Sequence, residues 1–162
     1  MKKLILLLLF IPLLSFGQKA PVLDFGIIEP TVVEVDSLSK EQIYDRVNSW
    51  VNNTYRSPED VLKVNNLSQI RLRALDKCFF QSIALGKVCY NVYYNLTIDI
   101  KEGRYRFSFD FDRISYQLLD PAFRFQVYYK KPGTLRRGKG AALAVETANQ
   151  SIAALYNLSL IH

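Results

Sequence analysis

Residues 88–112 constrain the fold more than any other part of this chain, because apolar and polar side chains alternate through them almost without a break. The apolar residues take even numbers over 88–100 and odd numbers over 105–111. Alternation of this kind predicts two half-buried strands. Glu102 and Gly103 lie between them and predict a two-residue hairpin turn, in which the glycine supplies the positive φ angle.

The position of this turn also fixes how the two strands pair. Counting outward from it places Ile98 opposite Phe107 and Asp99 opposite Arg106, so that the apolar side chains share one face. A shift of one residue would turn the apolar set to the polar face, so the register is strongly specified. An exposed Asp99–Arg106 ion pair contributes at most about 1 kcal/mol, so burial sets the register.

A helix is predicted after a first strand at residues 31–35. Ser39 is suited to cap this helix, and Gln42 completes a capping box. Apolar residues recur at helical spacing over 43–54, which predicts one buried face. The residue before Pro58 avoids the helical region, so the helix is expected to end there.

The remaining segments complete a single α+β domain at residues 31–158, preceded by an irregular lead at residues 18–30. The other elements expected are strands at 61–64, 69–75 and 123–129, a turn at Asn65-Asn66, and a closing helix at 141–157. An insertion or an extra strand is left open between residues 114 and 140. One face of the sheet is apolar and should be covered by the two helices, while the polar face should meet solvent or a partner.

The N-terminus predicts where the protein works. Lys2 and Lys3 precede an apolar stretch at residues 4–14, and residues 15–17 then offer a cleavage site with small residues. This order is typical of a secretory signal peptide at residues 1–17. We therefore expect a mature chain that begins at Gln18, in the periplasm or outside the cell. Because no cysteine follows the cut, a lipid anchor is not expected, and no later segment is apolar enough to span a membrane.

Positive charge is concentrated in the second half of the chain. The whole sequence has a net charge of +6, and residues 101–140 carry ten basic and four acidic side chains. A basic loop within this segment holds Lys130, Lys131, Arg136, Arg137 and Lys139. Outside the cytoplasm, such a region favours an anionic envelope component or another envelope protein over nucleic acid. A merely solvated basic surface is the alternative.

Several segments together resemble a known protein family. Residues 39–46, Trp50-Val51 and residues 55–58 are similar to its helix signature, and residues 98–106 are similar to its lysine–acid–glycine–arginine hairpin. The family is the secreted Bacteroidetes domain of unknown function 4468, which has a fold like that of the TATA-binding protein (TBP). The resemblance implies a β-α-β4-α layout with a curved antiparallel sheet and two helices on one face. It implies no activity, catalytic residue or cofactor.

The polar face of the predicted sheet is the first candidate binding surface. Planar guanidinium groups and phenol rings suit the recognition of acidic or sugar ligands. The residues expected to share this face are Arg71, Arg73, Tyr93, Arg104, Arg106, Arg124 and Tyr128. The alternative is a solvated face with cross-strand charge pairs.

No catalytic, metal or cofactor site is expected. The single histidine, His162, is the last residue, which removes Ser-His and Cys-His schemes from the folded body. Asp110 and Asp112 share a strand face, but such carboxylates are usually solvated charges. We therefore expect a non-catalytic binding or interaction module of the cell envelope. A small carrier holding an apolar ligand between the sheet and the last helix is the alternative, and a histidine-independent enzyme is the third hypothesis.

Cys78 and Cys89 leave a disulfide open. An even number of cysteines in an exported protein permits one bridge. Strand parity places Cys78 on the apolar side and Cys89 on the polar side, so a direct bond needs a bulge or break near Asp76-Lys77. Two ordinary thiols are the alternative.

Overall fold

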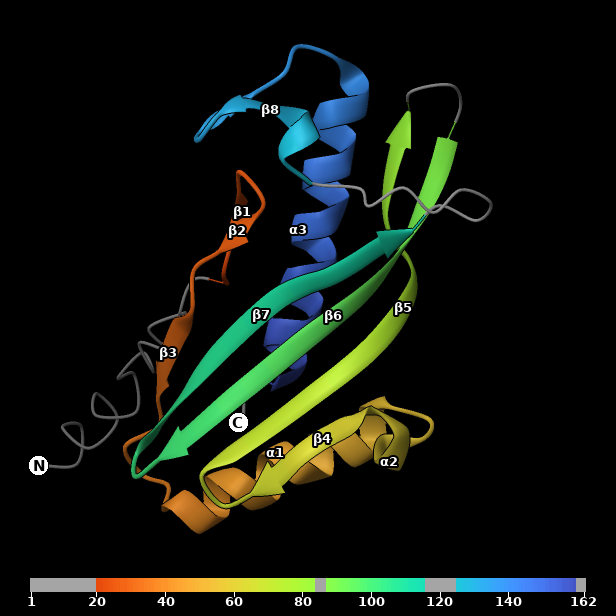
Figure 1. Ribbon diagram of the computed structural model, residues 1–162. Coiled ribbons are helices and arrows are strands. Elements are labelled where there is room, and N and C mark those ends of the chain that lie inside the picture. The colour runs from red at the N-terminus through yellow and green to blue at the C-terminus, as the bar shows by residue number, and fades with distance from the viewer. Residues whose placement is uncertain (1–19, 84–86, 116–124, 160–162) are drawn as a thin grey trace, which may run out of the picture.

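Two long strands form a hairpin within the sheet of the computed structural model, which describes residues 20–83, 87–115 and 125–159. They are β6 (Lys87–Lys101) and β7 (Arg104–Ser115). Ile98 lies opposite Phe107 and Asp99 lies opposite Arg106, so the predicted register of the hairpin is confirmed. The antiparallel sheet has five strands in the order β3-β7-β6-β5-β4 (Figure 1). The other three are β3 (Thr31–Glu34), β4 (Leu62–Asn66) and β5 (Gln69–Ile83).

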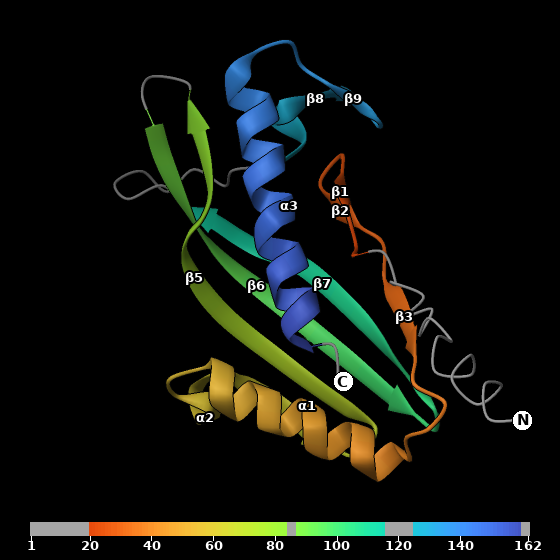
Figure 2. The ribbon, with the colours of Figure 1, turned by 180° about the vertical axis from the view of Figure 1, so that it is seen from behind.

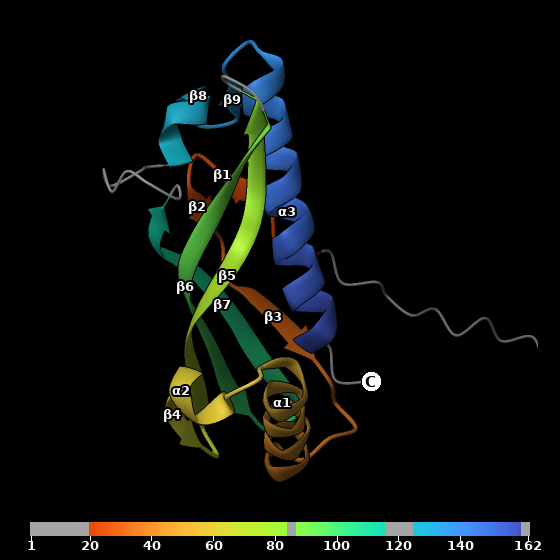
Figure 3. The ribbon, with the colours of Figure 1, turned by 90° about the vertical axis from the view of Figure 1, so that its right-hand side faces the viewer.

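Two helices, α1 (Lys40–Thr54) and α3 (Lys139–Ser159), lie on the same side of the sheet, as the side view in Figure 3 shows. Seen from behind, α1 crosses the sheet at the end that carries the β6–β7 turn, and α3 runs from there toward the opposite end (Figure 2). The predicted α+β fold, an antiparallel sheet with two helices on one face, is confirmed. We call the sheet face that neither helix covers the open face.

The predicted start of α1 is confirmed, and its predicted end is wrong. The Gln42 amide donates to Ser39 Oγ at 3.3 Å and the Ser39 amide donates to Gln42 Oε1 at 2.9 Å, so the capping box is present. The helix ends at Thr54, and Pro58 instead begins a short second helix, α2 (Pro58–Val61). Proline is tolerated at this position because the amide hydrogen it lacks would have no partner in the first turn.

Aromatic rings fill the space between the sheet and α3. Phe79 stacks on Phe109, and Phe107 meets the ring of Tyr156 edge-on, with ring centroids 5.8 Å and 5.5 Å apart. The buried residues that α3 contributes are Ala144, Val145, Ala148, Ile152, Leu155 and Tyr156. The alternating apolar residues of β6 and β7 thus meet a helical stripe of matching apolar character.

The turn between β4 and β5 lies two residues later than predicted. Asn65 and Asn66 belong to β4, and Leu67-Ser68 form the turn. Asn66 Oδ1 accepts hydrogen bonds from the amides of Ser68 and Gln69 at 2.9 Å and 3.0 Å. Asparagine therefore stabilises the turn through its side chain, from the position before it.

The segment predicted as an irregular lead forms a small hairpin that packs against the domain. β1 (Leu23–Asp24) pairs with β2 (Ile27–Ile28). The amide of Leu23 donates to Asn149 Oδ1 at 2.8 Å, and its carbonyl accepts a hydrogen bond from the Tyr129 hydroxyl at 3.0 Å. These partners are remote in sequence, so local pattern alone does not predict this hairpin.

The strand predicted at residues 123–129 is wrong within the described part of that range. Phe125–Tyr128 form a 3₁₀ helix, η1, which is followed by a separate two-stranded sheet of β8 (Tyr129–Lys131) and β9 (Thr134–Leu135). Phe125 and Tyr128 both contact the ring of Phe80. Residues three apart lie on one side of a 3₁₀ helix, so this geometry lets both rings reach the same buried partner.

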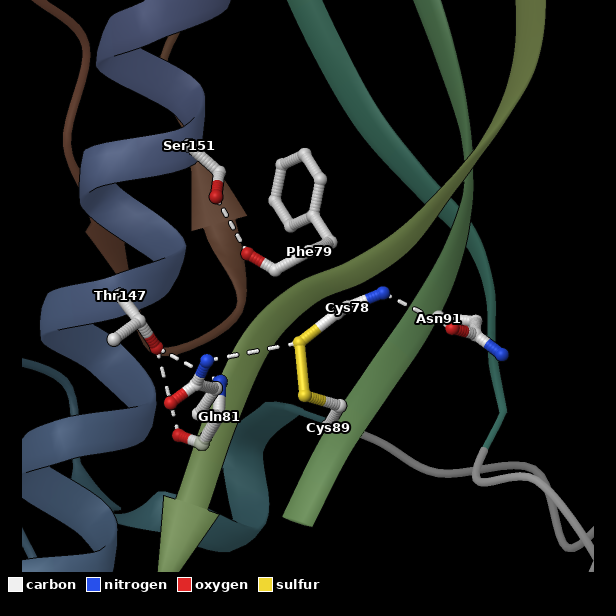
Figure 4. The surroundings of a disulfide bond; sticks show 7 residues. All are labelled: Cys78, Phe79, Gln81, Cys89, Asn91, Thr147 and Ser151. Carbon is white, nitrogen blue, oxygen red and sulfur yellow. Dashed lines mark hydrogen bonds between the residues drawn. A yellow bond between two sulfur atoms is a disulfide. The ribbon is translucent and has the colours of Figure 1, made fainter. Parts of the chain in front are cut away.

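β5 continues beyond its predicted end at Leu75 by means of a bulge. Its register with β6 shifts between Asp76 and Phe80, and Cys78 has a φ angle of +57°. Cys78 and Cys89 are joined by a disulfide, with Cα atoms 4.6 Å apart (Figure 4). The structure therefore contains the Cys78–Cys89 disulfide and also the bulge near Asp76-Lys77 that a direct bond was expected to need.

Two hydroxyl groups of α3 cover the outer edge of β5 beside the disulfide. Thr147 Oγ1 accepts the amide hydrogen of Gln81 at 2.9 Å, and Ser151 Oγ donates to the carbonyl of Phe79 (Figure 4). An open strand edge is a template for pairing with other chains. These hydroxyls satisfy backbone groups that no neighbouring strand of the described structure reaches.

Candidate functional site

The open face brings together five of the seven residues predicted to share it. Arg71, Arg73, Arg104 and Arg106 are exposed, while Tyr93 is half-buried. Their neighbours along each strand point into the core, because side chains alternate between the two faces. The predicted polar face is thus a continuous surface over β5, β6 and β7.

The other two predicted residues do not join this surface in the described structure. Arg124 lies outside the described residues. Tyr128 belongs to η1, where it is half-buried against Phe80 and Phe125. Burial raises the pKa of Tyr128 to about 12. Its placement on the open face was wrong, because the segment is helical and its alternation does not continue the sheet.

One arginine of the open face is held by a carboxylate. Arg106 Nη2 lies 2.6 Å from Asp99 Oδ2, and Gln69 Nε2 donates to Asp99 Oδ1 at 2.7 Å. Partial burial acts to raise the pKa of Asp99, but the hydrogen bonds from Gln69 and Arg106 outweigh it and hold this pKa below its usual value. Asp99 is therefore ionised and fixed, and it neutralises much of the charge of Arg106.

A second set of partners lies farther along the same face. Arg73 Nη2 lies 2.6 Å from Asp112 Oδ2, and the Arg113 guanidinium sits 4.4 Å from the centre of the Tyr93 ring. A bulge at Asp112 makes this arrangement, because Phe111 pairs with Tyr94 while Arg113 pairs with Tyr93. Asp112 is thus an ion-pair partner. This part of the open face fits the alternative stated for it, a solvated surface with cross-strand charge pairs.

A depression of about 780 Å³ lies where the open face ends at the β6–β7 turn. We call this region the turn end of the sheet. The depression is lined by cationic, amide and hydroxyl residues together with three apolar or aromatic ones. The polar residues are Lys40, Lys101, Arg104, Arg106, Asn66, Ser68 and Gln69, and the others are Val32, Ile100 and Tyr105. Asp99 is the carboxylate among its lining residues. The site is therefore positively charged and rich in hydrogen-bond donors.

Sequence reasoning missed five of the seven polar lining residues, Lys40, Asn66, Ser68, Gln69 and Lys101. They come from the start of α1, the residues at and beside the β4–β5 turn and the end of β6, which meet at one end of the sheet. Lys40 Nζ donates to Ser68 Oγ at 2.8 Å across this junction. The sequence pointed to only one of these residues: the predicted hairpin register places Lys101 opposite Arg104.

The predicted basic loop is a hairpin with all five cations exposed. Lys130 and Lys131 lie on β8, and Arg136, Arg137 and Lys139 follow β9 into α3. The Arg136 amide donates to the carbonyl of Tyr128 at 2.8 Å, and its Nε donates to the carbonyl of Tyr129 at 3.2 Å. We call residues 129–139 the basic hairpin, and with the start of α3 they form the hairpin end of the molecule.

A buried tyrosine pair was also missed. The hydroxyls of Tyr55 and Tyr94 lie 3.0 Å apart between the end of α1 and the middle of β6. Burial raises the pKa of both hydroxyls, so they stay neutral at physiological pH. The pair satisfies two polar groups within the core, which is a structural role.

The structure gives the apolar carrier no support and reveals no metal cluster among the residues that it describes. The depression lies at the end of the open face, while aromatic rings pack between the sheet and α3. Within the described ranges, no three His, Cys, Asp or Glu side chains are grouped to hold a metal ion. None of the described helices is long and apolar enough to cross a bilayer.

Known proteins match this chain at the level of family and fold. A family model described as "Domain of unknown function (DUF4468) with TBP-like fold" matches residues 30–117. A DUF4468 family protein from Bacteroides ovatus superposes with a TM-score of 0.61 at 17% identity, covering 87% of this chain and 90% of its own. A TBP-like protein from Parabacteroides distasonis gives a TM-score of 0.61 at 15% identity, covering 81% and 88%. No curated protein matches the sequence.

Proposed function

Because the chain belongs to the DUF4468 family, which is described by its TBP-like fold and not by an activity, we propose a function from the surface of this chain itself. The protein is an exported, non-catalytic binding module of the cell envelope. It binds an acidic saccharide in the depression at the turn end of the open face.

The mixture of groups around the depression carries this proposal. An acidic saccharide offers carboxylates and many hydroxyls on one molecule. Guanidinium and ammonium groups bind carboxylates, and amide and hydroxyl side chains exchange hydrogen bonds with sugar hydroxyls. The depression presents both kinds side by side, with Lys101 and Arg104 next to Ser68 and Gln69.

Of the four cations that line the depression, Lys40 is hydrogen-bonded to Ser68 and Arg106 is paired with Asp99, which leaves the other two to a ligand. Arg106 is engaged by Asp99 at 2.6 Å and forms part of the floor of the site. Arg104 Nη1 is 3.9 Å from Glu34 Oε1, which is too far for a hydrogen bond. Lys101 is exposed at the end of β6. Arg104 and Lys101 are therefore the residues we assign to the carboxylate.

The size and openness of the depression suit part of an extended chain. Its volume of about 780 Å³ falls within the range of small-molecule sites. Because it lies at the edge of an exposed face, a saccharide longer than the depression has room to continue along that face. Because side chains alternate between the two faces of the sheet, β5, β6 and β7 present further polar side chains to the saccharide there.

Export is the second part of the proposal and rests on residues 1–17, which lie outside the described residues. Mass spectrometry of the protein recovered from the envelope fraction should give a chain that begins at Gln18. Recovery of the intact chain from the cytoplasm alone would contradict export.

Calorimetric titration of the exported protein with trigalacturonate tests the binding site. We expect binding that is lost with the uncharged methyl ester of the same saccharide. The double variant Lys101→Ala/Arg104→Ala should bind at least about ten-fold more weakly, since each lost charge-assisted hydrogen bond costs about 1.5–3 kcal/mol. Arg56→Ala/Lys63→Ala also removes one arginine and one lysine, outside the depression, and should bind like the wild type.

Two results would overturn the saccharide assignment. Equal affinity for the ester would mean that charge is not recognised, and equal affinity of the two double variants would mean that the depression is not the site. Chromatography of the recovered ligand provides the check on catalysis. Intact trigalacturonate is expected, and shortened products would identify an enzyme.

A further inference from the structure

We propose that the basic hairpin is a docking surface for an anionic lipid bilayer. It lies at the end of the molecule opposite the β6–β7 turn (Figure 1) and shares no residue with the depression. The inference is independent of the proposed saccharide site.

Charge is the first observation. Residues 130–139 contain five basic side chains and no acidic one. All five are exposed, and no carboxylate of the described residues lies within 4.0 Å of their charged groups. The nearby Asp24 accepts a hydrogen bond from the Gly133 amide at 2.9 Å and so is engaged with the hairpin backbone. The arginines of the sheet face, in contrast, include two within 2.6 Å of a carboxylate.

Exposed apolar side chains beside these cations are the second observation. Val127 on η1 is 50% exposed, Leu135 on β9 is 37% exposed and Ile27 on β2 is 58% exposed. The segments that carry them pack together, because Asp24 bonds to the tip of the hairpin and lies opposite Ile27 in the β1–β2 ladder. Cations and apolar side chains therefore occur together at one end of the molecule.

This combination favours a bilayer surface over a soluble polyanion. Lysine and arginine near an anionic membrane each contribute about five-fold to binding. Apolar side chains gain further by entering the boundary between headgroups and acyl chains. A nucleic acid or a soluble polyanion would use the cations and would gain little from Val127, Leu135 and Ile27.

The hairpin is held firmly enough to present these groups together. Arg136 is tied to the carbonyls of Tyr128 and Tyr129 through its amide and its Nε. Tyr129 is buried and reaches back to Leu23 through its hydroxyl. The hairpin therefore forms a fixed patch. With this patch against a bilayer, the β6–β7 turn would lie at the far end of the molecule (Figure 1), and so would the depression, which Lys101 and Arg104 beside that turn line.

Vesicle flotation of the exported protein, after removal of residues 1–17, tests the proposal. Vesicles of phosphatidylcholine with 30% phosphatidylglycerol should bind the protein, and vesicles of phosphatidylcholine alone should not. The variant Lys130→Ala/Lys131→Ala/Arg137→Ala should bind about 100-fold more weakly, at about five-fold per cation. Arg56→Ala/Lys63→Ala/Lys77→Ala removes the same number and kinds of charge elsewhere and should bind like the wild type.

A second variant separates a membrane from a soluble polyanion. Val127→Ser/Leu135→Ser keeps every charge and should weaken vesicle binding several-fold, while leaving any binding to heparin unchanged. Unchanged vesicle binding by this variant, or by the triple lysine–arginine variant, would overturn the proposal. The triple hairpin variant should keep its affinity for trigalacturonate, and Lys101→Ala/Arg104→Ala should keep its affinity for vesicles, so the two proposals fail separately.

Discussion

The two ends of this molecule carry the same sign of charge in different surroundings. At the turn end, Arg106 lies 2.6 Å from Asp99 and Arg104 lies 3.9 Å from Glu34, among the amides and hydroxyls of a depression. At the hairpin end, five cations lie within ten residues with no acidic residue between them. Both groups of cations come largely from residues 101–140, so the net charge of that segment does not separate them.

The difference lies in how each end could act on a partner. Fixed ion pairs and hydrogen-bond donors give direction and suit a small ligand with several polar groups. Cations without carboxylate partners give a longer-range attraction that salt screens over about 8 Å at physiological ionic strength. Predictions that separate the ends therefore concern the contacts that hold each one in place.

Removal of the disulfide should have the largest effect on stability. The effect should be greatest in the second half of β5, which lies nearer the hairpin end. The bond joins Cys78 to Cys89 across 11 residues. In Cys78→Ser/Cys89→Ser we expect the free energy of unfolding to fall by about 3 kcal/mol, which lowers the melting temperature by roughly 10 °C. Hydrogen exchange should quicken at residues 79–83 before residues 96–100. Equal loss of protection in both segments would contradict a local effect of the disulfide on residues 79–83.

Loss of the edge contact from α3 should have the next largest effect. Thr147→Val removes the acceptor for the Gln81 amide and leaves that amide beside an apolar group. We expect a loss of about 1–2 kcal/mol in urea unfolding. Thr97→Val on the open face is the matched control and should stay within about 0.5 kcal/mol. Equal effects from both would show that the α3 hydroxyls do not protect the β5 edge.

A glycine substitution compares the two hairpin turns directly. Gly103 and Gly133 have φ angles of +66° and +71°, so alanine is strained at both by about 1 kcal/mol. Gly103 also exchanges backbone hydrogen bonds with Val35 and Leu38 at the entry to α1. Gly103→Ala should therefore lower the free energy of global unfolding by about 1 kcal/mol. Gly133→Ala should lower it less, because the short β8–β9 hairpin opens locally. A larger loss for Gly133→Ala than for Gly103→Ala would contradict this difference between the two turns.

The smallest effect should come from the ion pair of the open face. The pKa of Asp99 is held below its usual value when folded. Its stabilising contribution is thus present above the ordinary aspartate pKa of about 3.9 and is lost as the pH falls through the lower folded pKa. Arg106→Ala should lower stability by at most about 1 kcal/mol at pH 7, and the loss should shrink at pH 3. A loss that stays constant over this range would contradict a role for the Asp99 charge.

The central hairpin could be predicted from the sequence because every constraint on it is local. Alternation marks both faces, and Gly103 marks the turn. The structure adds a bulge at Asp112, where Phe111 and Arg113 pair with adjacent residues of β6. A complete period-two pattern leaves one register that buries all the apolar residues.

The second half of β5 could not be predicted because its support comes from elsewhere in the chain. Asp76, Lys77 and Cys78 interrupt the alternation, and Cys78 adopts a positive φ angle. The Cys78 amide is satisfied by Asn91 Oδ1 at 3.0 Å, and the strand edge beyond it is satisfied by α3. No local pattern encodes such contacts between remote residues.

The candidate site was predicted in part for the same reason. Arg104 and Arg106 follow from the alternation of β7, but the depression also needs Lys40, Asn66 and Ser68 from other elements. Tyr128 was misplaced because the alternation over residues 123–129 predicts a strand, whereas Phe125 and Tyr128, three residues apart, share one side of a 3₁₀ helix and both contact Phe80. Which of the predicted residues lie close together therefore depends on contacts between elements that are remote in sequence.

Amide chemical-shift mapping of one labelled sample of the chain without residues 1–17 tests the distinction between the two ends most directly. Trigalacturonate should perturb the amides of Lys40, residues 66–69 and residues 99–106. Nanodiscs that contain phosphatidylglycerol should perturb residues 127–139 and leave the first set unchanged. If both ligands perturbed the same residues, or if neither perturbed its assigned end, the account of two cationic ends with different partners would be contradicted.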